Sequence, residues 1–260
     1  CRASWSIDAI CKPNRLGRHL FLYSIEESIK KIKVILYILN RRKTDLIELN
    51  TQGYSGELQY KPGDHIGIFA ENRRELVDAI LAKVANAPPC DQLVKIEILR
   101  EKPSVFGVSK QWIVDERYPA CTLRCALTNF LDITSTISQN MLMYLSTQAA
   151  NENDRIQLER LSKDHIAYEE WRLNGFPNLV EVLNEFPSLR PHASLLMTQL
   201  PKLQPRFYSI SSSSKITDDI HITVGVVQYK LTGKSIRYGV CSKWLDELQV
   251  GKIVPSFVRA

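Results

Sequence analysis

Residues 206–212 carry the densest group of side chains that could do chemistry. They read Arg-Phe-Tyr-Ser-Ile-Ser-Ser and predict a strand, in which alternate residues share a face. An arginine can pair with phosphate through its planar guanidinium, a tyrosine offers a flat surface to an aromatic ring, and a serine hydroxyl can donate to a ring nitrogen. Together these groups suit a flat heterocycle joined to a diphosphate. An ordinary edge strand with a polar turn explains the same residues, and composition alone favours that alternative.

Three shorter motifs carry weaker signals. Residues 239–242, Gly-Val-Cys-Ser, suit a helix start whose free amides bind an anion, although a plain helix cap is commoner. Residues 62–65, Pro-Gly-Asp-His, place a carboxyl beside an imidazole and could do acid–base work. A turn in which Asp64 accepts backbone amides is the favoured interpretation there. Residues 218–221, Asp-Asp-Ile-His, seldom converge on one ion at this spacing, so no metal site is predicted.

The elements that must position these motifs change in type along the chain. Apolar, β-branched runs predict strands at 31–39, 44–49, 58–60, 66–69, 93–99, 206–212, 220–227 and 253–258. Helical periodicity predicts one helix that starts at Asn72, with Glu75 as its capping partner, and stops before Pro88. Further helices are predicted after Thr122, after Thr136 with Gln139, and over 151–161, 164–173, 178–186 and 192–200. A strand end turning into a helix is predicted at 239–245.

The order of strands, helices and strands predicts a mixed fold. We expect an antiparallel β-barrel or sandwich that is interrupted by a mainly α-helical insertion, because the first strands alone make too little sheet to stand independently. The expected boundaries are a basic N-terminal segment at 1–42, a first barrel part at 43–69, the insertion at 70–200 and a second barrel part at 201–260.

Composition excludes several classes of protein. The chain has 260 residues, 44% of them hydrophobic and 24% charged, which excludes a disordered or collagen-like chain. The longest apolar run, 34–39, is far shorter than the roughly 20 residues of a membrane-spanning helix, so no transmembrane segment is predicted. No Gly-X-Gly occurs, which excludes a Rossmann fingerprint. The six cysteines form no C-x-x-C pair, which favours reduced thiols and a cytoplasmic location.

The net charge of +6 is concentrated at the N-terminal end. Residues 1–43 contain ten Lys/Arg and three Asp/Glu. Apolar residues interrupt this basic segment, so we expect a solvated arm or a docking surface for an acidic partner rather than binding of nucleic acid.

Taken together, the motifs resemble a known family. Residues 206–212 match the R-x-Y-S-x-x-S flavin motif of the ferredoxin–NADP reductase superfamily, and residues 239–245 are similar to its pyrophosphate-binding helix start. Residues 60–69 resemble the P-G-D-H-x-G-x-F stretch of the diflavin reductases. Within that group, residues 168–171, 180–188 and 200–205 resemble the reductase portion of the nitric oxide synthase family. The resemblance covers about 43–260.

The resemblance implies roles for individual residues. Arg206 would bind the pyrophosphate of FAD, Tyr208 would stack on the isoalloxazine, and Ser209 would hydrogen-bond near the reactive flavin nitrogen and assist hydride transfer. Lys43 would contact NADPH, a role that Arg41 or Arg42 could fill instead. The other implied FAD contacts are His65, Thr223, Gly225, Val240, Cys241 and Ser242.

The resemblance also implies a function. Such a segment would pass electrons from NADPH through FAD to FMN and then haem, for nitric oxide synthesis from arginine, and its helical insertion would orient the FMN-binding module. The whole enzyme would also use tetrahydrobiopterin, calmodulin and a homodimer partner. We expect the NADPH-binding module to begin after Ala260, so this segment alone should not make nitric oxide. Two alternatives remain: another diflavin reductase, acting on cytochrome or sulfite reductase, and a truncated docking fragment without catalysis.

Overall fold

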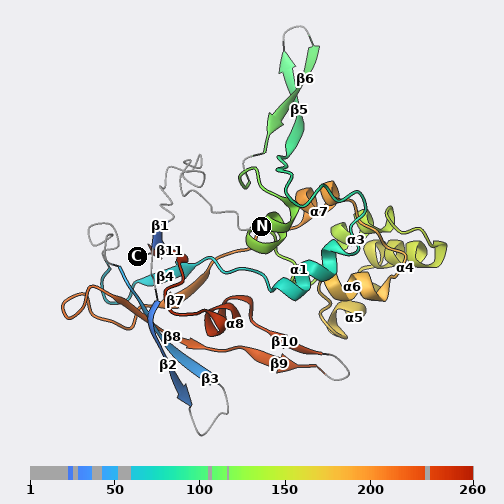
Figure 1. Ribbon diagram of the computed structural model, residues 1–260. Coiled ribbons are helices and arrows are strands. Elements are labelled where there is room, and N and C mark those ends of the chain that lie inside the picture. The colour runs from blue at the N-terminus through green and yellow to red at the C-terminus, as the bar shows by residue number, and fades with distance from the viewer. Residues whose placement is uncertain are drawn as a thin grey trace. The chain divides into compact units, whose positions relative to one another are not determined.

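The computed structural model describes residues 23–25, 29–36, 43–51, 60–104, 107–115, 117–231 and 235–259. The chain divides into two compact units (Figure 1). The sheet unit combines residues 1–71 with 204–260, and the helical unit is the intervening segment, 72–203. The sheet unit is therefore built from two stretches that lie far apart in the sequence.

Two antiparallel sheets form most of the sheet unit. One has the order β1-β11-β4-β7, with bounds Tyr23–Ile25, Val254–Arg259, His65–Ile68 and Arg206–Ser209. The other has the order β2-β3-β8, with bounds Ile29–Leu36, Lys43–Leu49 and Ile220–Gly225. The hairpin of β9 (Gln228–Lys230) and β10 (Ile236–Tyr238) leads into helix α8 (Val240–Glu247). A bridge between Ile210 and Ile222 links the end of β7 to β8.

The core of the sheet unit follows from the two-residue period of its strands. Alternate residues of β3 and β8 are buried, and Cys241 and Leu245, one turn apart on α8, pack into the same cluster. Helix α8 therefore covers the buried face of this sheet and lies beside it in Figure 1. Asp45 is also buried on β3, as a charged side chain on an otherwise apolar face.

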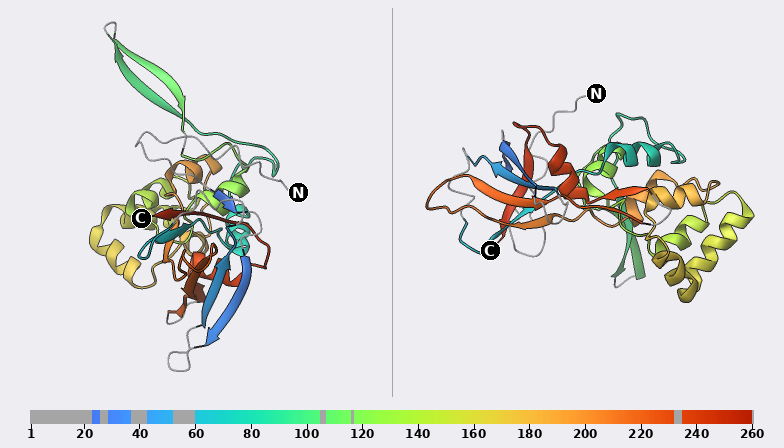
Figure 2. Two further views of the ribbon diagram at one scale, coloured as in Figure 1. Left: turned by 90° about the vertical axis from the view of Figure 1, so that its left-hand side faces the viewer. Right: turned by 90° about the horizontal axis from the view of Figure 1, so that it is seen from below.

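The helical unit has its own core. Its helices are α1 (Arg74–Leu81), α2 (Leu123–Cys125), α3 (Gln139–Ser146), α4 (Glu152–Lys163), α5 (His165–Leu173), α6 (Leu179–Glu185) and α7 (Ala193–Gln199), and the π-helix η2 (Ala126–Phe130) continues α2. Strands β5 (Glu97–Ser104) and β6 (Gly107–Val114) pair as a hairpin that extends away from these helices (Figures 1 and 2). The fully buried residues of the core of the helical unit include Leu127, Leu142 and Phe186.

Most of the predicted elements are confirmed. Strands β2, β3, β4, β8 and β11 and helices α4 to α8 lie where the periodicity placed them, with ends shifted by a few residues. Thr122 caps α2 as predicted, since its side chain accepts from the Cys125 amide. The expected strand residues 37–39, 58 and 59 lie outside the described residues, as do Arg41 and Arg42.

Two predicted helix caps are wrong. Asn72 does not cap α1, which begins after Arg73, because the Asn72 side chain donates instead to the carbonyls of Leu127 and Leu131. Thr136 does not cap α3, because Ser138 accepts the Met141 amide and starts that helix. Ser138 thus takes the capping role at α3, whereas Arg73 occupies the N-cap position of α1 without a side-chain cap hydrogen bond.

Three predicted boundaries are also wrong. Helix α1 ends at Leu81, well before Pro88. Residues 93–99 are not one strand: Val94 makes a bridge to Cys121, and β5 begins only at Glu97. Strand β7 ends at Ser209 rather than at residue 212, because the chain turns there and the Ser211 amide donates to the His221 carbonyl. The mixed fold with antiparallel sheets is confirmed.

Candidate functional site

Strands β4 and β7 present four of the predicted site residues. In the antiparallel register His65 lies opposite Ser209, and Ile66 lies opposite Tyr208. Directly opposed residues share a face, so His65 and Ser209 lie together, with both side chains exposed. Tyr208 lies on the other face and packs on the core of the sheet unit. Arg206 shares its face by alternation, is exposed, and donates to the Gln204 carbonyl at 2.8 Å.

The start of α8 supplies backbone donors. Gly239 is the N-cap residue, and the amides of Val240, Cys241 and Ser242 occupy the first turn, where an α-helix offers no carbonyl to accept them. The first turn contains no acidic residue. Such a helix start favours an anion, because free amides and the helix dipole both present positive charge.

Val227 packs tightly against this helix start. Its amide donates to the Ser242 hydroxyl at 3.0 Å, and the Gly239 amide donates to the Val227 carbonyl at 2.9 Å. A Cβ atom at Gly239 would lie 2.7 Å from the Ser242 hydroxyl and 2.9 Å from the Val227 Cβ, so only glycine fits. The Ser242 hydroxyl is thus used within the fold, and the amides remain as the anion donors.

Tyr208 connects β7 with α8. Its hydroxyl lies within hydrogen-bonding reach of the buried Cys241 thiol. Burial raises the pKa of the Cys241 thiol to about 11, against an opposing effect of the Tyr208 hydrogen bond. Burial also raises the pKa of Tyr208. Both groups therefore stay protonated near neutral pH, so Tyr208 offers a neutral phenol and α8 a neutral thiol.

The structure does not place all predicted residues on one face. Thr223 and Gly225 lie on the exposed side of β8, opposite to the face that packs on α8. Tyr208 and Cys241 meet on the inner side, and His65 and Ser209 meet on the outer face of β4 and β7. These residues fit a flavin dinucleotide in chemistry: an exposed guanidinium and an acid-free helix start suit a pyrophosphate, and a half-buried tyrosine suits a ring.

Asp64 plays the structural role that the sequence favoured. Its carboxylate accepts the Lys61 amide at 2.7 Å, and its own amide donates to the Lys61 carbonyl. Gly63 in this turn has a φ of +100°, a conformation that favours glycine. The turn positions His65 at the start of β4 and leaves Asp64 without a catalytic geometry.

Sequence reasoning missed a charged cluster between β3 and α8. Lys43, predicted as an NADPH contact, donates to Asp246 of α8 in this structure, and Asp45 lies 3.7 Å from the same ammonium. Lys243 pairs with the second oxygen of Asp246 at 3.0 Å. Lys43 and Asp246 are 203 positions apart, so no local pattern could pair them. The one sequence signal for this cluster was Asp45, an aspartate on the apolar face of β3.

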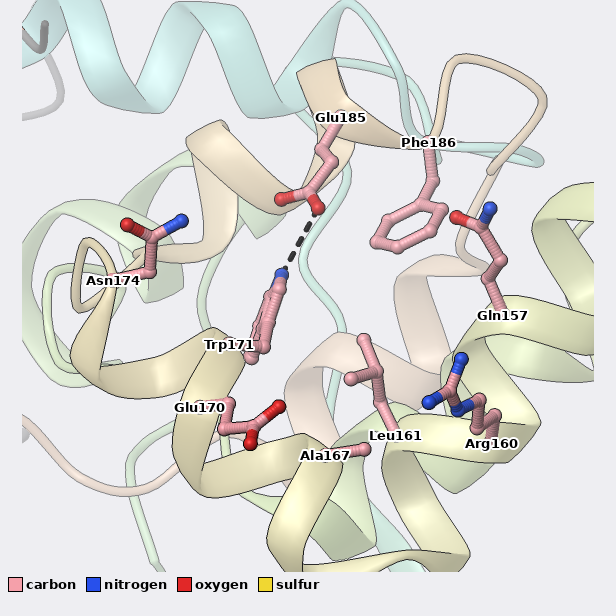
Figure 3. Close-up of a pocket in the computed structure, with 9 residues that line it drawn as sticks. All are labelled: Gln157, Arg160, Leu161, Ala167, Glu170, Trp171, Asn174, Glu185 and Phe186. Carbon is pink, nitrogen blue, oxygen red and sulfur yellow. Dashed lines mark hydrogen bonds between the residues drawn. The ribbon is translucent and has the colours of Figure 1, made fainter.

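A cavity of about 620 Å³ lies in the helical unit (Figure 3). Trp171 and Phe186 form part of its wall, and the Trp171 indole donates to Glu185 at 3.0 Å. None of the predicted flavin residues lines it. Within the described ranges, no three acidic, histidine or cysteine residues gather as a metal site, and no helix is long and apolar enough to cross a membrane.

Comparison with known proteins decides the family. Residues 27–244, most of the chain, match the sequence profile of the FAD-binding domain family. The chain belongs to this family. Residues 206–209 and the start of α8 lie inside the matched range of the FAD-binding domain.

Two relatives are similar over most of the chain. The nitric oxide synthase of Anopheles stephensi is 42% identical over 243 residues, 91% of this chain and 19% of its own length. Nitric oxide synthase 3 of Sus scrofa is 47% identical over 222 residues, 84% of this chain and 18% of its own length. The chain therefore spans less than a fifth of the length of the curated relatives it matches.

Proposed function

We propose that this chain is the FAD-binding segment of a nitric oxide synthase, an NADPH-dependent oxidoreductase. The observation that carries the proposal is a flavin-type strand and an acid-free helix start within one FAD-binding domain. The two relatives named above are both nitric oxide synthases, which favours this enzyme over the cytochrome and sulfite reductase flavoproteins.

FAD, when bound, supplies the hydride and single-electron chemistry. The Arg206 guanidinium and the amides of Val240, Cys241 and Ser242 would hold its pyrophosphate. The Tyr208 ring would pack against the isoalloxazine. The Ser209 hydroxyl, beside His65, would donate near the reactive flavin nitrogen. Thr223 and Gly225, on the exposed side of β8, would contact the cofactor.

The two sheets of this domain would together form the barrel that the sequence predicts. The bridge between Ile210 and Ile222 supports this arrangement because it ties β7 of one sheet to β8 of the other. The helical insertion would orient an FMN-binding module. NADPH, haem, tetrahydrobiopterin, calmodulin and a homodimer partner belong to the proposed whole enzyme, which we place in the cytoplasm.

The test is retention of FAD by the purified 260-residue chain. After FAD is added and excess removed, the visible absorption spectrum should show bound flavin, and Arg206→Ala should weaken binding at least about tenfold because a charged phosphate contact is lost. Arg155→Ala is the control, since Arg155 pairs with Glu152 in the helical unit at 2.5 Å. Folded wild-type protein without flavin, or an Arg206→Ala variant that binds FAD normally, would contradict the proposal.

A further inference from the structure

The charged cluster described above joins α8, which carries predicted flavin contacts, to β3, the neighbour of a strand that carries two others. Lys43 opens β3, which pairs along its length with β8, the strand of Thr223 and Gly225. Asp246 lies on α8, whose first turn carries the candidate pyrophosphate donors. The Lys43–Asp246 ion pair is thus a direct side-chain bond between the sheet and the phosphate-binding helix.

The carboxylate end of the pair is buried, whereas the Lys43 side chain is 39% exposed. The Asp246 side chain is 9% exposed, and both of its oxygens are held, one by Lys43 and the other by Lys243. Burial opposes ionisation of Asp246, but the hydrogen bonds from the two lysines outweigh it and lower its pKa. Asp246 is therefore charged at neutral pH, when the pair is complete.

Asp45 makes Lys43 hard to replace. Its side chain is 1% exposed, and neither of its oxygens accepts a hydrogen bond from the part of the chain that the structure describes. The Lys43 ammonium at 3.7 Å is its ion partner. A single cation thus serves two buried carboxylates, one on the sheet and one on the helix.

Besides the core packing of Cys241 and Leu245, polar bonds hold helix α8 to the sheet unit at two further places. Val226 donates its amide to the Lys43 carbonyl at 2.8 Å, and the next residue, Val227, exchanges hydrogen bonds with Gly239 and Ser242 at the helix start. The Lys43–Asp246 pair forms the second attachment, two turns further along the helix. The ion pair therefore adds to the core packing of α8 a polar bond that opposes tilting of the helix axis.

We propose that Lys43 and Asp246 are positioning residues for FAD, and that their ion pair fixes the direction in which α8 presents its first-turn amides to the pyrophosphate. This inference rests on the proposed function. It also gives the Lys43 ammonium a role within the protein, as the partner of Asp246.

Asp246→Ala is the primary test, because it leaves Lys43 free to neutralise Asp45. Glu247→Ala is the matched control: Glu247 is the adjacent carboxylate on α8 and pairs with Lys243 at 3.2 Å. We expect Asp246→Ala to raise the Kd for FAD about tenfold, as for other truncated buried charge pairs, and Glu247→Ala to change it less than about twofold. At saturating FAD, the visible absorption bands of Asp246→Ala should match wild type, because the isoalloxazine site is untouched.

Two further variants separate positioning from general structural support. Lys43→Arg should bind FAD like wild type, since a guanidinium can hold both carboxylates. Lys43→Met should raise the Kd for FAD at least as much as Asp246→Ala, because it breaks the pair and also leaves Asp45 without a cation. Normal FAD affinity in Asp246→Ala, or bound-flavin bands that shift together with the affinity, would overturn the inference. Wild-type protein that fails to bind FAD would instead overturn the proposed function, and the inference with it.

Discussion

Cys241 shows how burial controls chemistry at a single residue. Its thiol is buried against Tyr208, and burial raises its pKa to about 11, so only about 0.1% is thiolate at pH 8. Cys90 is exposed. We expect iodoacetamide at pH 8 to alkylate Cys90 rapidly and Cys241 at least about a hundredfold more slowly, read by peptide mass spectrometry. In urea both should react at similar rates, and fast native labelling of Cys241 would show that it is accessible.

Asp132 gives the helical unit a defined response to pH. Burial opposes its ionisation, but hydrogen bonds from the side chains and amides of Ser135 and Thr134 outweigh burial and lower its pKa. A lowered pKa in the folded state contributes stability above the unfolded pKa, about 3.9, which is lost as the pH falls through the folded pKa.

Asp132→Asn should therefore lower the free energy of unfolding by about 2 kcal/mol at pH 7. The difference from wild type should shrink as the pH falls below about 4, because the wild-type carboxyl then becomes neutral as well. Urea unfolding at pH 7 and pH 3 measures both values. A constant difference across this range would mean that the charge of Asp132 contributes nothing.

At the scale of elements, Asn72 holds the end of the π-helix η2. Its side-chain nitrogen donates to the carbonyls of Leu127 and Leu131 at 2.7 Å each, and the residue is 3% exposed. Asn72→Ala should destabilise the helical unit by about 2–3 kcal/mol, because two buried carbonyls lose their donor. Chemical unfolding followed by far-UV circular dichroism measures this. Glu75→Ala, at the position predicted to complete the cap, should cost less than about 0.5 kcal/mol.

The same residue shows what sequence can and cannot predict about elements. Helical periodicity located α4 to α7, because the apolar residues that one helix face buries recur every three or four positions along the sequence. Asn72 has the composition of a helix cap, yet its partners lie 55 and 59 positions away. The hairpin of β5 and β6 was missed because its residues do not alternate: Trp112 and Val108 are both more than 60% exposed, so no buried face set a pattern.

The candidate site likewise has parts that the sequence predicts and parts that it does not. Arg206, Tyr208 and the start of α8 were found because each motif is contiguous. That Tyr208 meets Cys241, and that Lys43 meets Asp246, follows from strand register and helix packing between distant segments. The assignment of Lys43 to NADPH came from resemblance alone and stays a prediction.

At the scale of the whole molecule, both ends of the helical unit are bonded to the interior of the same unit. The amides at its two ends, Asn72 and Leu203, donate to the carbonyls of Thr128 and Phe130 at 2.8 Å each. Its core is separate from that of the sheet unit. We expect residues 72–203, expressed alone, to fold and to unfold in one cooperative transition in urea.

The control is the same fragment with Leu142→Ala, which removes a fully buried side chain and should cost about 2–5 kcal/mol. Addition of FAD should leave the midpoint of the fragment unchanged. A non-cooperative transition, or little difference between fragment and control, would show that the helical unit needs the sheet unit to fold.

The division of the sheet unit into two stretches also has a consequence during protein synthesis. Strand β3 ends at Leu49, but its partner β8 begins only at Ile220, roughly 170 residues later. At about 5–20 residues per second, a ribosome needs on the order of ten seconds to deliver that partner. The nascent chain carries an open strand edge throughout this interval. Translation that stops before β8 should therefore give a product whose sheet strands are prone to aggregate, even where the helical unit has folded.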